Sequence, residues 1–219
     1  MLRNKFQKEM EILNKELTAM AALIERIISF STDALIKQDK ALCERVILDR
    51  DQVKNARAEV ESKALKIILM QQPVAFDLRK ISTALKMIVD LERIASQARD
   101  ICEIILYLCE EDYQLQLEIL LKMGSMVKQM VYDCVNSFVK EDEALAKKTI
   151  EADNEIDALF DKLKQKMIQL IKDKPNLVDQ AIYLLMIGKH LEKIGDHAEN
   201  IAEWVIYSKT GKHKNIKII

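Results

Sequence analysis

Apolar residues recur every three or four positions along almost the whole chain, which is the spacing of one buried stripe on an amphipathic helix. Near the N-terminus, for example, Leu13, Leu17 and Ile24 follow this spacing. Pro73 and Pro175 interrupt the pattern, and proline is poorly tolerated inside a helix. The pattern predicts six long helices, at about residues 6–38, 40–70, 77–108, 115–140, 143–171 and 177–208.

Polar residues mark the remaining boundaries. Asp39 precedes the second helix and is a plausible N-cap, because its side chain can accept hydrogen bonds from free backbone N–H groups. Glu110, Glu111 and Asp112 form a short acidic break at mid-chain, and Glu141-Asp142 separates the fourth and fifth helices. These breaks group the helices into two sets of three.

The two sets are copies of one another. Shifted by 103 residues, IKQDKALCERVI (36–47) aligns with VKEDEALAKKTI (139–150); shifted by 100, LERIASQARDICEIILY (91–107) aligns with LEKIGDHAENIAEWVIY (191–207). Matching shifts in several helices, with prolines at corresponding ends, indicate duplicated units. The predicted fold is all-α, with two tandem, pseudo-symmetric three-helix bundles at 1–110 and 111–208 and a flexible basic tail at 209–219.

Composition supports this class and excludes others. The chain has 219 residues, of which 49% are apolar, with only four Gly and two Pro, as is typical of a helical protein. The formal net charge of −1 favours neither nucleic acid nor an anionic membrane surface. We expect no signal peptide and no membrane span, because no apolar run approaches about 18 residues. No C-x-x-C pair occurs among four cysteines that we expect to be reduced and buried, as in a cytoplasmic protein: Cys43, Cys102, Cys109 and Cys134.

Carboxylates form a ladder on the last helix, beside its apolar stripe. They are spaced i, i+4, i+7 and i+11, at Glu192, Asp196, Glu199 and Glu203. The fifth helix carries a second ladder, at Asp153, Asp157 and Asp161. Like charges at this spacing repel one another, so the ladders need positive charge from neighbouring Lys or Arg side chains or from a metal ion.

The first half provides an internal comparison. Asp153 and Asp157 correspond to Arg50 and Lys54, and Asp196 corresponds to Ser96. Glu199 and Asp161 likewise correspond to Arg99 and Ala58, whereas Glu192 matches Glu92. If the ladders hold a cation, the second bundle therefore has the site, and the first has lost most of it.

Four residues are the preferred metal ligands: Asp153, Asp157, Glu192 and Asp196. Oxygen ligands one turn apart on adjacent helices suit a hard cation such as Mg²⁺, Mn²⁺, Ca²⁺ or iron. His197 and Asn200 are weaker candidates. The alternative is a solvated acidic edge balanced by lysines, among them Lys164, Lys189 and Lys193.

Catalytic motifs are missing from the sequence. None of the three histidines follows a Glu at the Glu-x-x-His spacing of di-iron bundles, and the glycines form no nucleotide-binding loop. We therefore do not expect an enzyme. Gly188 and Gly195 lie inside the last helix, where glycine is unfavourable, which suggests close helix packing or ligand access.

Three segments resemble the PhoU family of accessory proteins of bacterial phosphate-specific transport. LEKIGDHAENIAE at 191–203 is similar to the family signature, LERIASQARDI at 91–101 to a degenerate copy, and QQPVAFDLRKI at 71–81 to the linker into the third helix. The resemblance implies two symmetric bundles and metal binding at E/D-x-x-x-D motifs. These match Glu192-x-x-x-Asp196 and Asp153-x-x-x-Asp157, whereas the first half departs from the motif.

The resemblance also implies a function. It is negative regulation of phosphate uptake and of the phosphate-starvation response, by a cytoplasmic, homodimeric, non-enzymatic adaptor. The implied partners are the ATPase subunit of the phosphate transporter and a sensor histidine kinase, and the implied cofactor is iron, Mg, Mn or Zn. Two other readings stay open: a metal-dependent enzyme that uses the acidic residues of the second bundle, and a structural helical adaptor without metal.

Overall fold

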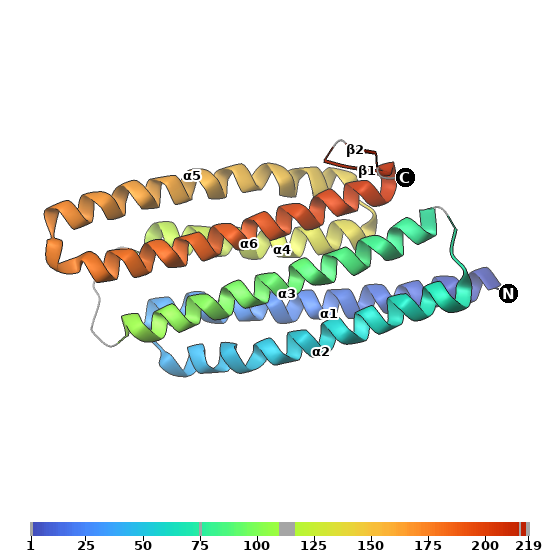
Figure 1. Ribbon diagram of the computed structural model, residues 1–219, viewed down its shortest axis with the longest axis horizontal. Coiled ribbons are helices and arrows are strands. Elements are labelled where there is room, and N and C mark those ends of the chain that lie inside the picture. Colours follow the sequence, from blue (N-terminus) through green and yellow to red (C-terminus); the bar gives the residue numbers. More distant parts are fainter. Residues whose placement is uncertain (1, 75, 110–116, 215, 218–219) are drawn as a thin grey trace.

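The computed structural model describes residues 2–74, 76–109, 117–214 and 216–217 (Figure 1). The predicted all-α fold of six long helices is confirmed, with a short 3-10 turn η1 (Pro175–Leu177) before the last helix. The acidic break at 110–112 lies outside the described residues. The long helices are α1 (Leu2–Lys37), α2 (Lys40–Gln71), α3 (Phe76–Leu108), α4 (Glu118–Lys140), α5 (Glu143–Asp173) and α6 (Val178–Thr210).

The two halves begin their second helices with the same local structure. Asp39 caps α2, because its Oδ1 accepts hydrogen bonds from the N–H groups of Ala41 at 2.9 Å and Leu42 at 3.2 Å. Asp142 caps α5 in the same way, through the N–H of Leu145 at 3.0 Å. Each Asp follows a residue in the left-handed region, at φ 54° and 55°. The repeat is therefore visible in the backbone as well as in the sequence.

The six helices form two bundles that share one core. Helices α1–α3 lie together, and α4–α6 lie beside them, with both chain ends at the same end of the molecule (Figure 1). Between the halves α3 packs against α6 and α1 against α4, whereas α2 and α5 are on the outside. One apolar cluster runs through both halves. No helix in the described ranges is long and apolar enough to cross a membrane.

Two polar contacts lie between α3 and α6 and mirror each other. His190 is hydrogen-bonded to Gln97 at 2.8 Å, and His197 to Asp90 at 3.0 Å. The repeat shift of 100 residues exchanges the two pairs, because it relates position 90 to 190 and 97 to 197. This exchange is what a twofold relation between the halves requires.

The described end of the chain is short and folded back. Helix α6 ends at Gly211, whose φ of 72° suits the left-handed cap that glycine adopts without strain. The strands β1 (Lys212–His213) and β2 (Ile216–Lys217) then pair antiparallel. The His213 ring stacks on Trp204 with 3.8 Å between ring centroids. The segment for which the sequence predicts a flexible tail thus forms a hairpin in its described part.

The cap at Asp39 can be tested directly. Because Asp39→Ala leaves two N–H groups of α2 without their side-chain acceptor, we expect a loss of about 1 kcal/mol in the free energy of unfolding. Asp39→Asn should retain most of that stability, since its side-chain oxygen still accepts. Urea denaturation followed by circular dichroism measures both variants. Equal stability of Asp39→Ala and the natural chain would contradict the assigned cap.

Candidate metal centre

Three carboxylates converge where α5 packs against α6. Asp153 and Asp157 lie one turn apart on α5 and Asp196 lies on α6, and one oxygen of each is within 4.8 Å of the others. Asp153 is buried, with 7% of its surface exposed, whereas the Asp196 side chain is 38% exposed and Asp157 faces solvent. This acidic cluster (Asp153, Asp157 and Asp196) therefore leads from the core to the surface.

Gly195 makes room for the buried carboxylate. A Cβ atom at Gly195 would lie 2.6 Å from Oδ1 of Asp153, which is closer than real Cβ contacts. At Gly188, about two turns earlier, a Cβ would lie 2.2 Å from Cδ2 of Leu163. Both glycines thus allow α5 and α6 to approach closely, as their position inside a helix suggests. At Gly195 the group that lies against α6 is the carboxyl of Asp153, whereas at Gly188 it is the apolar side chain of Leu163.

The acidic cluster lacks positive charge at its buried end. Oδ1 of Asp153 is buried and has no hydrogen-bond partner. Burial raises the pKa of Asp153 to about 7, and the carboxylates of Glu199, Asp196, Asp157 and Glu192 add to the rise. Burial and the charge of Glu192 also raise the pKa of Asp157. A proton or a bound cation would relieve this repulsion.

Glu192, the fourth predicted ligand, lies at the edge of the acidic cluster. Its Oε2 is paired with Nζ of Lys189 at 2.5 Å and lies 3.8 Å from Nζ of Lys193. Asp196 is also paired with Lys193. Both lysines belong to α6 and are more than 40% exposed. The structure thus brings three of the four predicted ligands together and gives Glu192 a lysine partner.

His197 and Asn200, the weaker candidates, bind elsewhere. His197 is hydrogen-bonded to Oδ1 of Asp90 on α3, and Nδ2 of Asn200 donates to Oδ2 of the same carboxylate at 2.7 Å. These side chains join the two halves of the molecule. Asp90 was not singled out from the sequence, although an Asp next to Leu91 on a buried stripe was a usable signal.

The equivalent place in the first half contains arginine. Nη2 of Arg50 is 3.5 Å from Oγ of Ser96 and 3.9 Å from Oε1 of Glu92. Arg57 is also paired with Glu92. The sequence comparison predicted the change at Arg50 but did not identify Arg57, whose counterpart at the shift of 103 is Phe160. These donors are cationic, so this place does not fit a metal ion.

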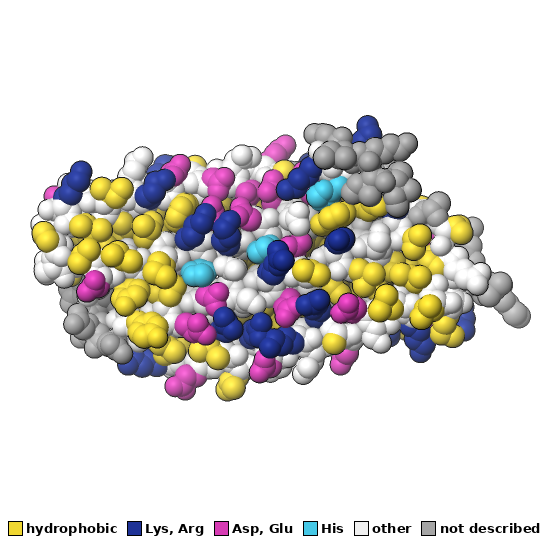
Figure 2. Space-filling view, viewed as in Figure 1, with side chains coloured by type: hydrophobic (Ala, Val, Ile, Leu, Met, Phe, Trp, Pro, Cys, Tyr) yellow, Lys and Arg dark blue, Asp and Glu magenta, His cyan; other side chains and the backbone are white. Residues whose placement is uncertain are grey.

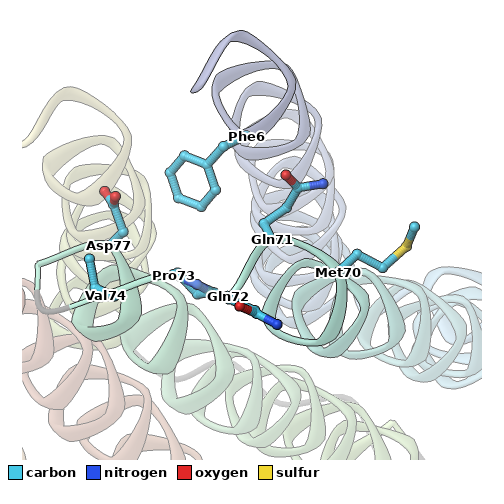
Figure 3. Close-up of a pocket in the computed structure, with 7 residues that line it drawn as sticks. All are labelled: Phe6, Met70, Gln71, Gln72, Pro73, Val74 and Asp77. Atoms are coloured by element: carbon cyan, nitrogen blue, oxygen red, sulfur yellow. The ribbon is translucent and has the colours of Figure 1, made fainter. Parts of the chain in front are cut away.

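A separate pocket of about 380 Å³ lies at one end of the first half, where α2 turns into α3 (Figure 3). The segment that resembles the family linker forms one wall, and Phe6 of α1 lies across from it (Figure 3). Asp77 is the acidic residue among those that line it. Because a lone carboxylate is a poor metal site, the acidic cluster between α5 and α6 is the stronger candidate.

Comparison with known proteins settles the family. A family model described as the PhoU domain matches two segments, residues 17–105 and 120–205. The chain belongs to the PhoU family. These two matches cover the two helical halves in turn, which agrees with the internal repeat.

Relatives of known sequence and structure are similar over nearly the whole chain. It is 36% identical to a phosphate-specific transport system accessory protein PhoU homolog from Aquifex aeolicus, over 97% of this chain and 98% of the relative. A homolog from Clostridium acetobutylicum is 33% identical over 99% of both chains. The crystal structure of PhoU from Pseudomonas aeruginosa superposes with a TM-score of 0.89 at 30% identity, covering 94% of this chain and 100% of that one.

The donors of this PhoU-family chain fit the kind of metal that the family motif implies. Asp153, Asp157 and Asp196 offer only carboxylate oxygens, the donors that hard cations prefer. The buried oxygen of Asp153 that has no partner is a ready ligand atom. Each carboxylate has a second oxygen, so the cluster can hold a cation and remain hydrogen-bonded to water or lysine.

The pKa of Asp153 gives a pH-dependent prediction for metal-free protein. Because the folded pKa of about 7 exceeds the ordinary value of 3.8, the folded chain binds a proton that the unfolded chain releases. Stability should therefore fall as pH rises from about 4 to about 7 and then level off.

The neutral variant Asp153→Asn isolates this effect. In EDTA we expect its stability advantage over the natural chain to grow across the same pH range, to a few kcal/mol, since one pKa unit is worth about 1.4 kcal/mol. Thermal denaturation at a series of pH values measures the difference. A difference that does not change with pH would show that Asp153 titrates normally.

Proposed function

We propose that this PhoU-family chain is a regulatory accessory protein of a phosphate-specific transport system and is not an enzyme. It reduces phosphate uptake and the phosphate-starvation response when phosphate is plentiful. The names of its relatives as accessory proteins support this role. The similar structure from Streptococcus pneumoniae, 25% identical with a TM-score of 0.89, is titled as a phosphate transport system regulatory protein.

The role includes one bound metal centre in the second half. The observation that carries it is the buried oxygen of Asp153, which has no protein partner and lies among carboxylates. Asp153, Asp157 and Asp196 hold iron, Mn, Mg or Zn, and Glu192 joins them when Lys189 releases it. Because the ligands come from both α5 and α6, the metal links these helices and stabilises the second half.

The same proposal makes the molecule a cytoplasmic adaptor. Its long helical faces contact the ATPase subunit of the transporter and a sensor histidine kinase, and it acts as a homodimer. Charged side chains gather in the middle of the face over α3 and α6, with apolar ones toward both ends (Figure 2). A surface of this kind supports docking by mixed polar and apolar contacts, as is usual for regulatory interfaces.

Metal content tests the centre. We expect protein purified without added metal to contain a metal ion, and Asp153→Asn to lose most of it. Asp161→Asn is the matched control: it removes one carboxylate from the same helix, but Asp161 is exposed and paired with Lys164. Mass spectrometry of the elements measures all three. Equal metal in the natural chain and Asp153→Asn would contradict the assigned ligands; Glu192→Gln shows whether Glu192 contributes.

A reporter of the phosphate-starvation response tests the regulatory role. In phosphate-rich medium we expect deletion of the gene to raise reporter output, and the natural gene to restore repression. The same output with and without the gene would refute negative regulation. The double variant Asp153→Asn with Asp196→Asn tests the metal: we expect it to restore repression poorly. Full repression by a folded, metal-free variant would instead support an adaptor that works without metal.

A further inference from the structure

The helix pairs α2–α3 and α5–α6 are equivalent in the repeat but have opposite charge at their contact. On α2, Arg50 and Arg57 both reach across to Glu92 of α3. On α5, Asp153 stands at the place of Arg50 and faces Asp196 of α6. The first contact joins opposite charges and the second joins like charges.

The first contact joins opposite charges of the chain itself, and the Nε atoms of Arg50 and Arg57 are buried there without a hydrogen-bond partner. The side chains of Arg50, Arg57 and Glu92 are 20%, 33% and 18% exposed, so water screens them less than a surface pair. Arg50 also lies near Ser96, which stands where Asp196 stands in the second half. We name Arg50, Arg57 and Glu92 the guanidinium clamp. It places two positive charges against Glu92, whose counterpart Glu192 is also acidic.

The second contact has no corresponding arginine. The counterpart of Arg57 is Phe160, which lies under Nζ of Lys189 at 5.3 Å from the ring centroid. Glu192 and Asp196 pair with Lys189 and Lys193, which belong to α6 itself, at a spacing of three residues. Such pairs neutralise charge along one helix but do not tie it to α5.

We propose that the guanidinium clamp fills, in the first half, the place that a metal ion takes in the second. The chain then carries one metal centre, and only its second half responds to metal. This inference rests on the proposed metal binding between α5 and α6. An arginine stays charged at any physiological pH and cannot dissociate from the chain, whereas a metal ion can. The helix contact in the first half is therefore independent of metal, whereas the contact in the second half depends on whether a metal ion is bound.

Hydrogen exchange of the full chain tests the asymmetry, with Mn²⁺ as the probe and EDTA as the metal-free state. We expect Mn²⁺ to slow exchange about tenfold in peptides from the middle of α5 and α6, around residues 150–162 and 190–203. Peptides from the equivalent part of α2, around 47–59, which packs against α1 and α3, should exchange equally in both states. Protection of both regions by Mn²⁺ would overturn the inference while leaving the metal proposal intact.

Exchanging the residues between the halves makes the test specific. Asp153→Arg, Phe160→Arg and Asp196→Ser copy the clamp into the second half: we expect Mn²⁺ to lose its effect and the EDTA state to gain a higher melting temperature. Arg50→Asp, Lys54→Asp, Arg57→Phe and Ser96→Asp copy the second half into the first: we expect additional bound Mn²⁺ by equilibrium dialysis. Arg93→Asp, at an exposed position on α3, controls for the change of charge.

The outcomes separate the two proposals. If Mn²⁺, Mg²⁺, Zn²⁺ and Fe²⁺ all leave the natural chain unchanged, the metal proposal fails, and the metal part of this inference fails with it. The clamp is then judged by a double-mutant cycle of Arg57→Ala and Glu92→Gln in EDTA, where strong coupling is expected and additive effects would refute it. If Mn²⁺ still slows exchange around residues 47–59 in Asp153→Asn with Asp157→Asn, the first half holds metal and the inference is wrong.

Discussion

The buried carboxylate of Asp153 is the constraint around which the second half is arranged. A carboxylate in a weakly hydrated place needs a positive charge or a proton, because burial disfavours the ionised form. Gly195 allows it to approach α6, because a Cβ at this position would lie 2.6 Å from Oδ1 of Asp153. Because the neighbouring groups are acidic as well, the ionised form of Asp153 is disfavoured at this contact, and a proton or a bound cation would relieve the repulsion.

The helices could be predicted from sequence because each one carries its own signals. The 3.6-residue apolar period, the Asp caps and the two prolines act within a few residues, and the duplication repeats them at matching positions. Asp39 illustrates this: its capping bonds are to residues two and three positions along the chain. The pairing of α3 with α6 and of α1 with α4 depends on contacts between distant residues, such as His197 with Asp90, which periodicity does not reveal.

The candidate site was predictable only in part, because it too depends on contacts between residues on different helices. Comparing the two halves identified Asp153, Asp157 and Asp196, since a negative charge that is reversed or lost in the other copy stands out. Glu192 was included because it shares the ladder, but spacing along a helix does not show that Lys189, three residues earlier, pairs with it. Arg57 was overlooked because its counterpart is the aromatic Phe160, so a search for lost carboxylates did not reach it. Whether a charged side chain pairs within its own helix or with the next helix depends on how far it extends, which the sequence spacing does not show.

Duplication explains how the same fold can have opposite charges paired at one helix contact and like charges at the equivalent contact in the other half. The apolar stripes and caps determine the bundle in both halves, so the polar positions between α2 and α3 were free to diverge from those between α5 and α6. Glu92 and Glu192 remain alike, but one is held across the helix contact by arginines and the other along its own helix by a lysine. An arginine makes a contact permanent, whereas a site for a dissociable ion makes it depend on conditions. Under the proposed regulatory role, the part of the molecule that changes with conditions is the second half, where the like charges meet.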